Sequence, residues 1–150
     1  MNSPLSKYIV FLKLALENNI IESDYVIKWA DDEISSKDIA LQDNFKVDLS
    51  LENNKCRLLE VLNDEIYKRG LGNQKVEGKM FLDLFKKQNP VSQEDVLKTI
   101  SRLLWLSHNV SFTKEKIEKI YLVDEYGDEY LDGIISFETV KETLYDLLKD

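Results

Sequence analysis

The sequence predicts an all-α protein, a compact bundle of six to seven helices joined by short loops. Glycine and proline are scarce, with 5 and 2 copies in 150 residues. Apolar residues recur at spacings of three and four positions, which is the period of a helix rather than the alternation of a strand. A hydrophobic content of 43% suffices for a core without disulfide or metal, because a chain of this size buries roughly 70% of its unfolded surface. We therefore expect one helical domain over residues 1–150.

Three helices are expected in the N-terminal half. Ser3 is placed to cap the first helix, and Pro4 suits its first position. A second helix is expected to begin at Ser23, and a third to cover residues 53–69 and stop at Gly70. The residues expected to face inward are Leu5, Tyr8, Ile9, Phe11, Leu12, Leu14 and Leu16, then Val26, Ala30 and Ile34, then Leu59, Leu62 and Ile66.

Residues 38–51 have a weaker pattern. Residues 38–45 fit a short turn of surface helix, whereas Val47, Leu49 and Leu51 alternate as in a strand. A lone strand has no evident partner here. The sequence leaves open whether residues 38–51 are helical or extended.

Four more helices are expected in the C-terminal half. One covers residues 76–88 and ends before Pro90, and the others are capped by Ser92, Thr113 and Ser136. The residues expected to face inward are Met80, Phe81 and Leu84, then Val96, Ile100, Leu103 and Leu104, then Ile117, Ile120 and Tyr121, then Val140, Leu144, Leu147 and Leu148.

Charge and composition exclude several classes of function. Acidic residues outnumber basic ones by 28 to 20, giving a net charge of −8, which opposes binding to nucleic acid phosphates or to an anionic membrane. One cysteine and one histidine are too few for a zinc site or a disulfide framework. We therefore expect no metal, no cofactor and no enzymatic activity. The absence of a signal peptide, of an apolar span and of a second cysteine predicts a cytoplasmic protein.

Two motifs match ligand-binding loops only in part. Residues 70–72 hold two glycines, but no strand precedes them and the third glycine of a dinucleotide loop is missing, so an interhelical turn is expected. Residues 128–139 match a calcium loop in part, for instance at Asp132 and Gly133. Tyr130 and Thr139 occupy two positions where such a loop needs carboxylate ligands. A structural turn is the favoured interpretation.

The single histidine and cysteine receive structural interpretations. His108 lies where the fifth expected helix ends, so it is expected to satisfy terminal carbonyls. Catalysis by His108 would need a partnered nucleophile, which nearness to Ser107 and Ser111 in sequence does not establish. Cys56 lies near the start of an expected helix and next to Lys55. A helix N-terminus and a neighbouring cation both favour the thiolate form of a cysteine. A small buried side chain is the commoner outcome for such a cysteine.

The densest feature is residues 124–132, where five carboxylates and two tyrosines occupy nine positions with no basic residue. Carboxylates steer a basic partner, and tyrosines provide large contact areas. An acidic loop kept for solubility is the alternative. The predicted partner-binding residues are Asp124, Glu125, Tyr126, Asp128, Glu129, Tyr130 and Asp132, with Asp31 and Asp32 as a weaker second patch.

Residues 25–34, Tyr-Val-Ile-Lys-Trp-Ala-Asp-Asp-Glu-Ile, followed by 47–51, Val-Asp-Leu-Ser-Leu, resemble a pattern in small bacterial α-helical immunity proteins. Such proteins accompany toxins of contact-dependent growth inhibition and polymorphic toxin systems. The resemblance implies a protein that binds and neutralises a cognate toxin. The acidic charge of the chain favours a basic nuclease domain as that toxin, because a nuclease must be basic to hold nucleic acid. Three other hypotheses stay open: an acidic nucleic-acid mimic that inhibits a host enzyme, a non-catalytic helical adaptor, and an enzyme using His108 or a carboxylate.

Overall fold

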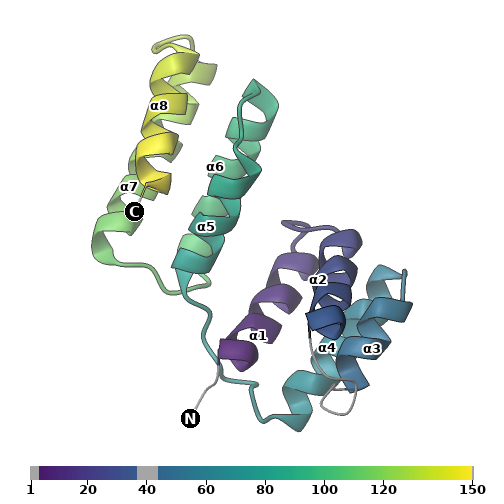
Figure 1. Ribbon diagram of the computed structural model, residues 1–150. Helices are drawn as coiled ribbons and strands as arrows, with labels where there is room; N and C mark the ends of the chain where they lie inside the picture. The colour runs from purple at the N-terminus through teal and green to yellow at the C-terminus, as the bar shows by residue number, and fades with distance from the viewer. Residues whose placement is uncertain (1–3, 37–43, 150) are drawn as a thin grey trace. The chain divides into compact units, whose positions relative to one another are not determined.

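The computed structural model describes residues 4–36 and 44–149, and all secondary-structure elements named in this part of the chain are α-helices (Figure 1). The all-α prediction is confirmed, but the described residues hold eight helices rather than six to seven. The first four are α1 (Pro4–Glu17), α2 (Ser23–Ser36), α3 (Asn44–Leu51) and α4 (Lys55–Lys68). The last four are α5 (Gly78–Gln88), α6 (Gln93–Ser107), α7 (Lys114–Leu131) and α8 (Phe137–Leu148).

The additional helix is α3, which the sequence left undecided. Phe45 and Leu49 are four residues apart and both are buried, so they form the inner side of one helical turn. Leu51 is 82% exposed, so the alternation of apolar residues up to this position does not mark a buried strand face. An extended structure is therefore wrong for residues 44–51. The rest of the uncertain segment, residues 38–43, lies outside the described residues, as does the expected cap Ser3.

Helix starts in the C-terminal half follow the predicted caps. The hydroxyl oxygens of Ser92, Thr113 and Ser136 each accept a hydrogen bond from the backbone N–H three residues on, at 3.1, 3.2 and 3.2 Å. Each bond satisfies one N–H group that the first turn of a helix leaves without a partner. The three caps are confirmed.

Gly70 ends α4 as predicted. Its φ of +66° is a left-handed conformation that favours glycine. The N–H groups of Gly70 and Leu71 donate to the carbonyls of Tyr67 and Ile66, at 3.1 and 2.9 Å, and so close the helix end. At the other end the helix begins at Lys55, later than expected, because the side chain of Asn54 caps it.

Helix α5 begins at Gly78 rather than at residue 76. The backbone before it pairs with the α6–α7 connection: Ser111 N–H donates to the Val76 carbonyl at 3.2 Å, and Gly78 N–H donates to the Ser111 carbonyl at 2.6 Å. These extended pairings hold residues 76 and 77 out of the helix.

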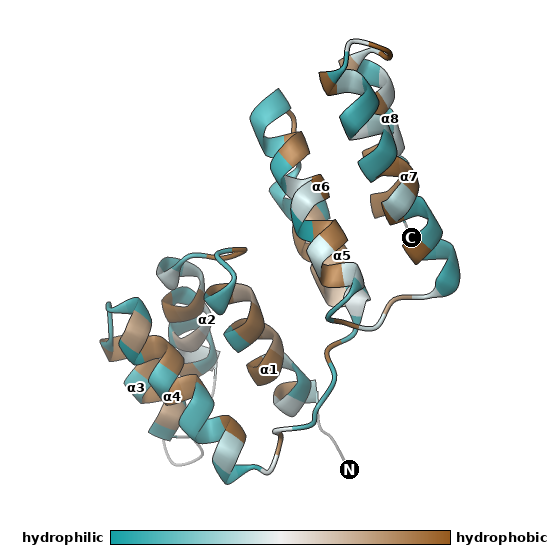
Figure 2. Ribbon diagram, turned by 180° about the vertical axis from the view of Figure 1, so that it is seen from behind, coloured by the Kyte–Doolittle hydropathy of each residue, from teal (hydrophilic) through white to brown (hydrophobic). Residues whose placement is uncertain are grey.

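The chain divides into two compact units of four helices, an N-terminal unit (Met1–Lys75) and a C-terminal unit (Val76–Asp150). In the N-terminal unit α4 contacts α1, α2 and α3, and α2 packs on α3. Helix α1 is hydrophobic along most of its length (Figure 2). The side chains that are fully buried in this unit are those of Ile9, Leu12, Ala15, Leu16, Val26, Ala30, Leu49, Leu58 and Leu62. The prediction of one domain over residues 1–150 stays a prediction.

In the C-terminal unit α8 contacts α5, α6 and α7, so the last helix completes the core. The fully buried side chains of this unit are Phe81, Phe85, Val96, Leu103, Leu106, Ile120, Val123, Val140, Leu144 and Leu147. Among the described residues, every helix is too short or too polar to span a membrane.

Some residues expected to face inward do not. Tyr121 is 46% exposed, because the inner side of α7 is set by Ile120, Val123 and Gly127, and the next residue along a helix is turned by about 100°. Cys56 is exposed, so its expected burial is also wrong. The expected core residues that are only half-buried are Leu5, Tyr8, Leu14, Ile34, Leu59, Ile66, Met80, Leu104 and Ile117.

Gly127 offers a test of the packing between α6 and α7. A Cβ at this position would lie 3.7 Å from Leu97 Cδ2 and 3.9 Å from Ile100 Cδ1, which are ordinary contact distances. Alanine favours a helix interior over glycine by about 1 kcal/mol. Gly127→Ala is therefore expected to raise the free energy of unfolding, measured in urea, by about 0.5–1 kcal/mol. A lower free energy than that of the wild-type protein would contradict this packing.

Candidate functional site: the acidic end of helix α7

The acidic segment 124–132 is helical rather than an acidic loop. Helix α7 continues through Leu131, and Asp132 is its C-cap. The buried stripe of Ile120, Val123 and Gly127 extends into the segment and fixes its helical phase. Negative charge near a helix C-terminus is unfavourable, because the helix dipole is negative at that end. Packing of the inner side therefore outweighs this cost.

Four of the carboxylates share one side of α7. Glu125, Asp128, Glu129 and Asp132 are spaced by three, four and seven residues, which places them on one helical face. Glu125, Asp128 and Asp132 are exposed, and Glu129 is half-buried. We call these four residues the α7 acidic face.

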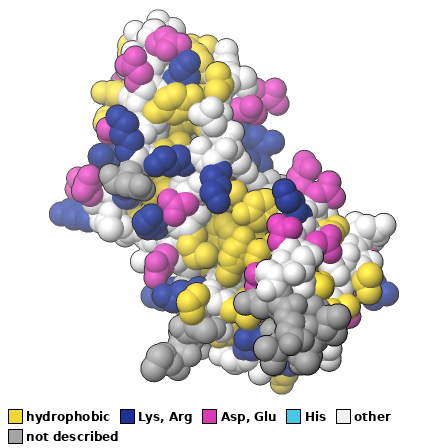
Figure 3. Space-filling model, in the orientation of Figure 1, with side chains coloured by type: hydrophobic (Ala, Val, Ile, Leu, Met, Phe, Trp, Pro, Cys, Tyr) yellow, Lys and Arg dark blue, Asp and Glu magenta, His cyan; other side chains and the backbone are white. Residues whose placement is uncertain are grey.

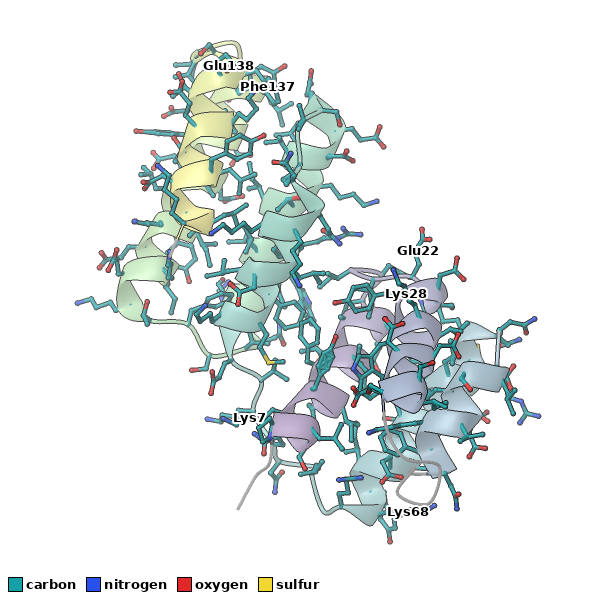
Figure 4. All side chains as sticks on the ribbon, in the orientation of Figure 1. Lys7, Glu22, Lys28, Lys68, Phe137 and Glu138 are labelled. Carbon is teal, nitrogen blue, oxygen red and sulfur yellow. The ribbon has the colours of Figure 1, made fainter. Side chains whose placement is uncertain are left out.

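The two tyrosines lie away from this face. Tyr126 and Tyr130 are four residues apart and both are half-buried. The ring centroid of Tyr130 lies 5.6 Å from that of Phe137, at the start of α8 and labelled in Figure 4. Tyr130 therefore contributes to packing between α7 and α8. The structure brings the carboxylates of the segment together but does not place the tyrosines among them.

The α7 acidic face is not neutralised by the cations near it. Within residues 4–36 and 44–149, none of its four carboxylates forms a salt bridge. Lys119 on the same helix pairs instead with Glu115 and Asp146, each at 3.4 Å. Lys141 on α8 pairs with Glu138 at 3.2 Å. Within the described residues, the carboxylates of this face therefore have no salt-bridge partner, and a basic molecule can pair with them.

Asp124 lies beside the acidic face and is half-buried. Burial raises the pKa of its carboxyl group, and the negative charge of Asp128, one turn along the helix, raises it further.

The raised pKa of Asp124 predicts a pH-dependent stability. The Asp124 carboxyl group keeps its proton to a higher pH in the folded protein than in the unfolded chain. The contribution of this protonation to the free energy of unfolding is therefore complete below the unfolded pKa, and it is lost as the pH rises through the folded pKa. Asp124→Asn, which stays neutral, should gain stability over the wild-type protein as the pH rises from about 3. Urea unfolding across a pH series measures this difference, and Asp128→Asn should reduce it. A difference that shrinks with rising pH would contradict the assignment.

Two exposed apolar side chains at the end of α7 were missed by the sequence reasoning. Leu131 is 64% exposed and Ile134 is 69% exposed. They flank the Asp132–Gly133 pair of the incomplete calcium loop. Residues 128–131 are helical, and Gly133, with a φ of +77°, begins the turn to α8, as the structural interpretation predicts.

The weaker patch, Asp31 and Asp32, lies on α2 in the N-terminal unit, and both residues are exposed. On the same helix Trp29 is half-buried, with its ring stacked on Tyr8 at a centroid distance of 5.3 Å. Burial raises the pKa of Tyr8, and its hydrogen bond with the Tyr25 hydroxyl, at 3.4 Å, adds to the effect. Trp29 therefore belongs to a packed aromatic group beside this patch.

Sequence reasoning also missed Lys46, which is buried in the N-terminal unit. Its ammonium group lies 3.2 Å from a carboxylate oxygen of Glu33 and 6.0 Å from the centroid of the Trp29 ring. A buried ammonium group needs such a partner. The contact joins α3 to α2.

A cavity of about 480 Å³ lies in the C-terminal unit, between the start of α5, the α6–α7 connection and the end of α8. Its lining residues are Glu77, Lys79, Leu82, Asp83, Ser111, Phe112, Thr113, Lys116, Leu148 and Lys149. His108 is not among them; it is the C-cap of α6, and its ring lies 6.3 Å from that of Tyr121. This cavity therefore does not provide the cleft that an enzyme using His108 would need.

Comparison with known proteins yields no relative. The chain matches no protein-family model, no curated protein and no solved structure. In the described part of the chain, no group of three or more histidine, cysteine, aspartate or glutamate side chains is placed to hold a metal ion.

Proposed function

We propose that this chain is an immunity-type protein that binds a basic toxin domain through the α7 acidic face and neutralises it. The observation that carries the proposal is a set of four carboxylates on one helical face, with no salt bridge among the described residues. Such a face accelerates the encounter with a basic protein.

A nuclease is the toxin class that this chemistry favours. A nuclease domain needs a basic surface to hold nucleic acid phosphates. An inhibitor with an acidic face therefore meets a complementary surface on the enzyme that it must block. The resemblance of residues 25–34 and 47–51 to bacterial immunity proteins supports the same function.

The nucleic-acid mimic is the second candidate. A mimic needs carboxylates spread along a surface at spacings close to those of phosphates. On this chain the densest carboxylates occupy one end of one helix. A localised acidic face favours a protein partner with a localised basic patch over an enzyme that follows a nucleic acid strand.

Affinity capture tests the proposal in the cells that naturally produce the protein. Tagged wild-type protein and the Asp128→Lys/Glu129→Lys variant are used as baits at low and at high salt, and captured proteins are identified by mass spectrometry. We expect one stoichiometric basic protein, retained by the wild-type bait and weakened by salt and by the charge reversal. Capture of a nucleic-acid-processing complex would favour the mimic. If Asp128→Lys/Glu129→Lys captured the partner as well as the wild-type bait does, the α7 acidic face would be excluded as the binding site.

A further inference from the structure

The α7–α8 turn presents two apolar side chains to solvent. Leu131 and Ile134 are 64% and 69% exposed. They are three residues apart at one end of the C-terminal unit. Figure 2 shows hydrophobic residues in this turn.

Backbone hydrogen bonds fix the turn. Gly133 N–H donates to the Tyr130 carbonyl at 3.0 Å, and Ile134 N–H donates to the Glu129 carbonyl at 2.8 Å. Ser136 then caps α8. In this kind of helix end the residue after the glycine often packs back on the helix. Ile134 is instead exposed on a turn whose backbone is held by these hydrogen bonds, so covering it costs little backbone entropy.

Carboxylates lie close to this apolar pair in the chain. Asp128 precedes Leu131 by one helical turn, and Asp132 lies between the two apolar residues in the chain. Glu138, labelled in Figure 4, is exposed at the start of α8. In the space-filling view, acidic and hydrophobic side chains lie at this end of the unit together with a basic side chain (Figure 3). An apolar centre with charged residues around it is the usual organisation of a protein–protein hot spot.

We propose that Leu131 and Ile134 are the anchors of the interface formed by the α7 acidic face, and that the partner offers an apolar pocket bordered by lysine or arginine side chains. This inference rests on the proposed function and adds the contact that holds the complex together. The acidic face and the apolar anchors act on different rate constants. Exposed charges determine the association rate constant, whereas desolvated apolar contacts determine the dissociation rate constant.

Short synthetic peptides of defined chemistry test the inference on the full chain. One is an amphipathic helical peptide of leucine and lysine, the second replaces every leucine by serine, and the third replaces every lysine by glutamate. Binding is measured by fluorescence anisotropy at low salt. The variants are Leu131→Ser/Ile134→Ser, Asp128→Lys/Glu129→Lys, and Leu51→Ser/Tyr67→Ser as the matched control. The control removes two apolar side chains of the N-terminal unit that are 82% and 88% exposed.

The wild-type protein should bind the leucine–lysine peptide most tightly. Leu131→Ser/Ile134→Ser should weaken that binding about ten-fold, leave the serine–lysine peptide unaffected, and leave the unfolding transition unchanged. The matched control should bind as the wild-type protein does. Wild-type affinity in Leu131→Ser/Ile134→Ser would overturn the anchors alone, if the charge reversal still weakens both lysine peptides. If neither Leu131→Ser/Ile134→Ser nor Asp128→Lys/Glu129→Lys weakened peptide binding, the acidic face would be overturned as well. The same would follow if the wild-type protein bound the glutamate peptide as tightly as the leucine–lysine peptide.

Discussion

Gly78→Ala is expected to lower the free energy of unfolding of the C-terminal unit by about 2–3 kcal/mol. A Cβ on Gly78 would lie 2.6 Å from Cγ of Phe112 and closer still to Cδ1 and Cε1. The backbone cannot retreat freely, because Gly78 N–H donates to the Ser111 carbonyl at 2.6 Å. The ring of Phe112 must therefore leave its site, and contacts beside α5 are lost.

Urea unfolding of three further variants isolates this clash. Gly72→Ala is the control, because a Cβ there has no atom within 4 Å. Phe112→Ala removes the ring, so adding Gly78→Ala to it should cost less than about 0.5 kcal/mol. An equal cost of Gly78→Ala in both backgrounds would show that Phe112 is not what the added methyl group meets.

The charge reversal Asp128→Lys/Glu129→Lys is expected to slow association with a basic partner by about ten-fold or more at low salt. It replaces two negative charges of the α7 acidic face by two positive ones. Folding should be retained, because Asp128 is exposed, Glu129 is only half-buried, and lysine is favourable near a helix C-terminus. The measurement is stopped-flow association with the captured partner, together with urea unfolding of the variant.

Net charge alone could also slow association, so the reversal needs a matched control. Glu22→Lys/Asp64→Lys changes two exposed carboxylates of the N-terminal unit. Each double variant shifts the net charge from −8 by two for each of two residues, to −4. The control should retain most of the wild-type association rate constant. Equal slowing by both variants would mean that the partner senses total charge rather than the α7 acidic face.

Helix ends were predictable where they depend on a few neighbouring residues. Ser92, Thr113 and Ser136 cap their helices through one short hydrogen bond, and Gly70 ends α4 through its own φ angle. These signals are local, so the sequence contains them in full. The start of α5 was misplaced because it depends on pairing with Ser111, more than thirty residues away in the chain.

Burial depended on tertiary packing and was predicted less well. Lys46 is buried because Glu33 and Trp29, on another helix, surround its side chain. Tyr121 is exposed because the buried side of α7 contains the preceding residue, Ile120, and the next residue along a helix points in another direction. Neither outcome follows from the residue type, since lysine is usually exposed and tyrosine is often half-buried.

The candidate site was located by sequence but not resolved into faces. Residues 124–132 attract attention by composition alone. The separation of Glu125 and Glu129 from Tyr130 requires the phase of the helix, which the buried residues set. The exposure of Ile134 requires the geometry of the turn to α8.

The salt dependence of the association rate constant tests whether the partner binds at the α7 acidic face. Wild-type protein, Asp128→Lys/Glu129→Lys and Glu22→Lys/Asp64→Lys are each mixed with the captured partner at low and at high salt. We expect fast, salt-sensitive association for the wild-type protein and for Glu22→Lys/Asp64→Lys. Asp128→Lys/Glu129→Lys should associate slowly and with little sensitivity to salt. Equal rate constants and equal salt dependence for all three proteins would contradict binding through the α7 acidic face.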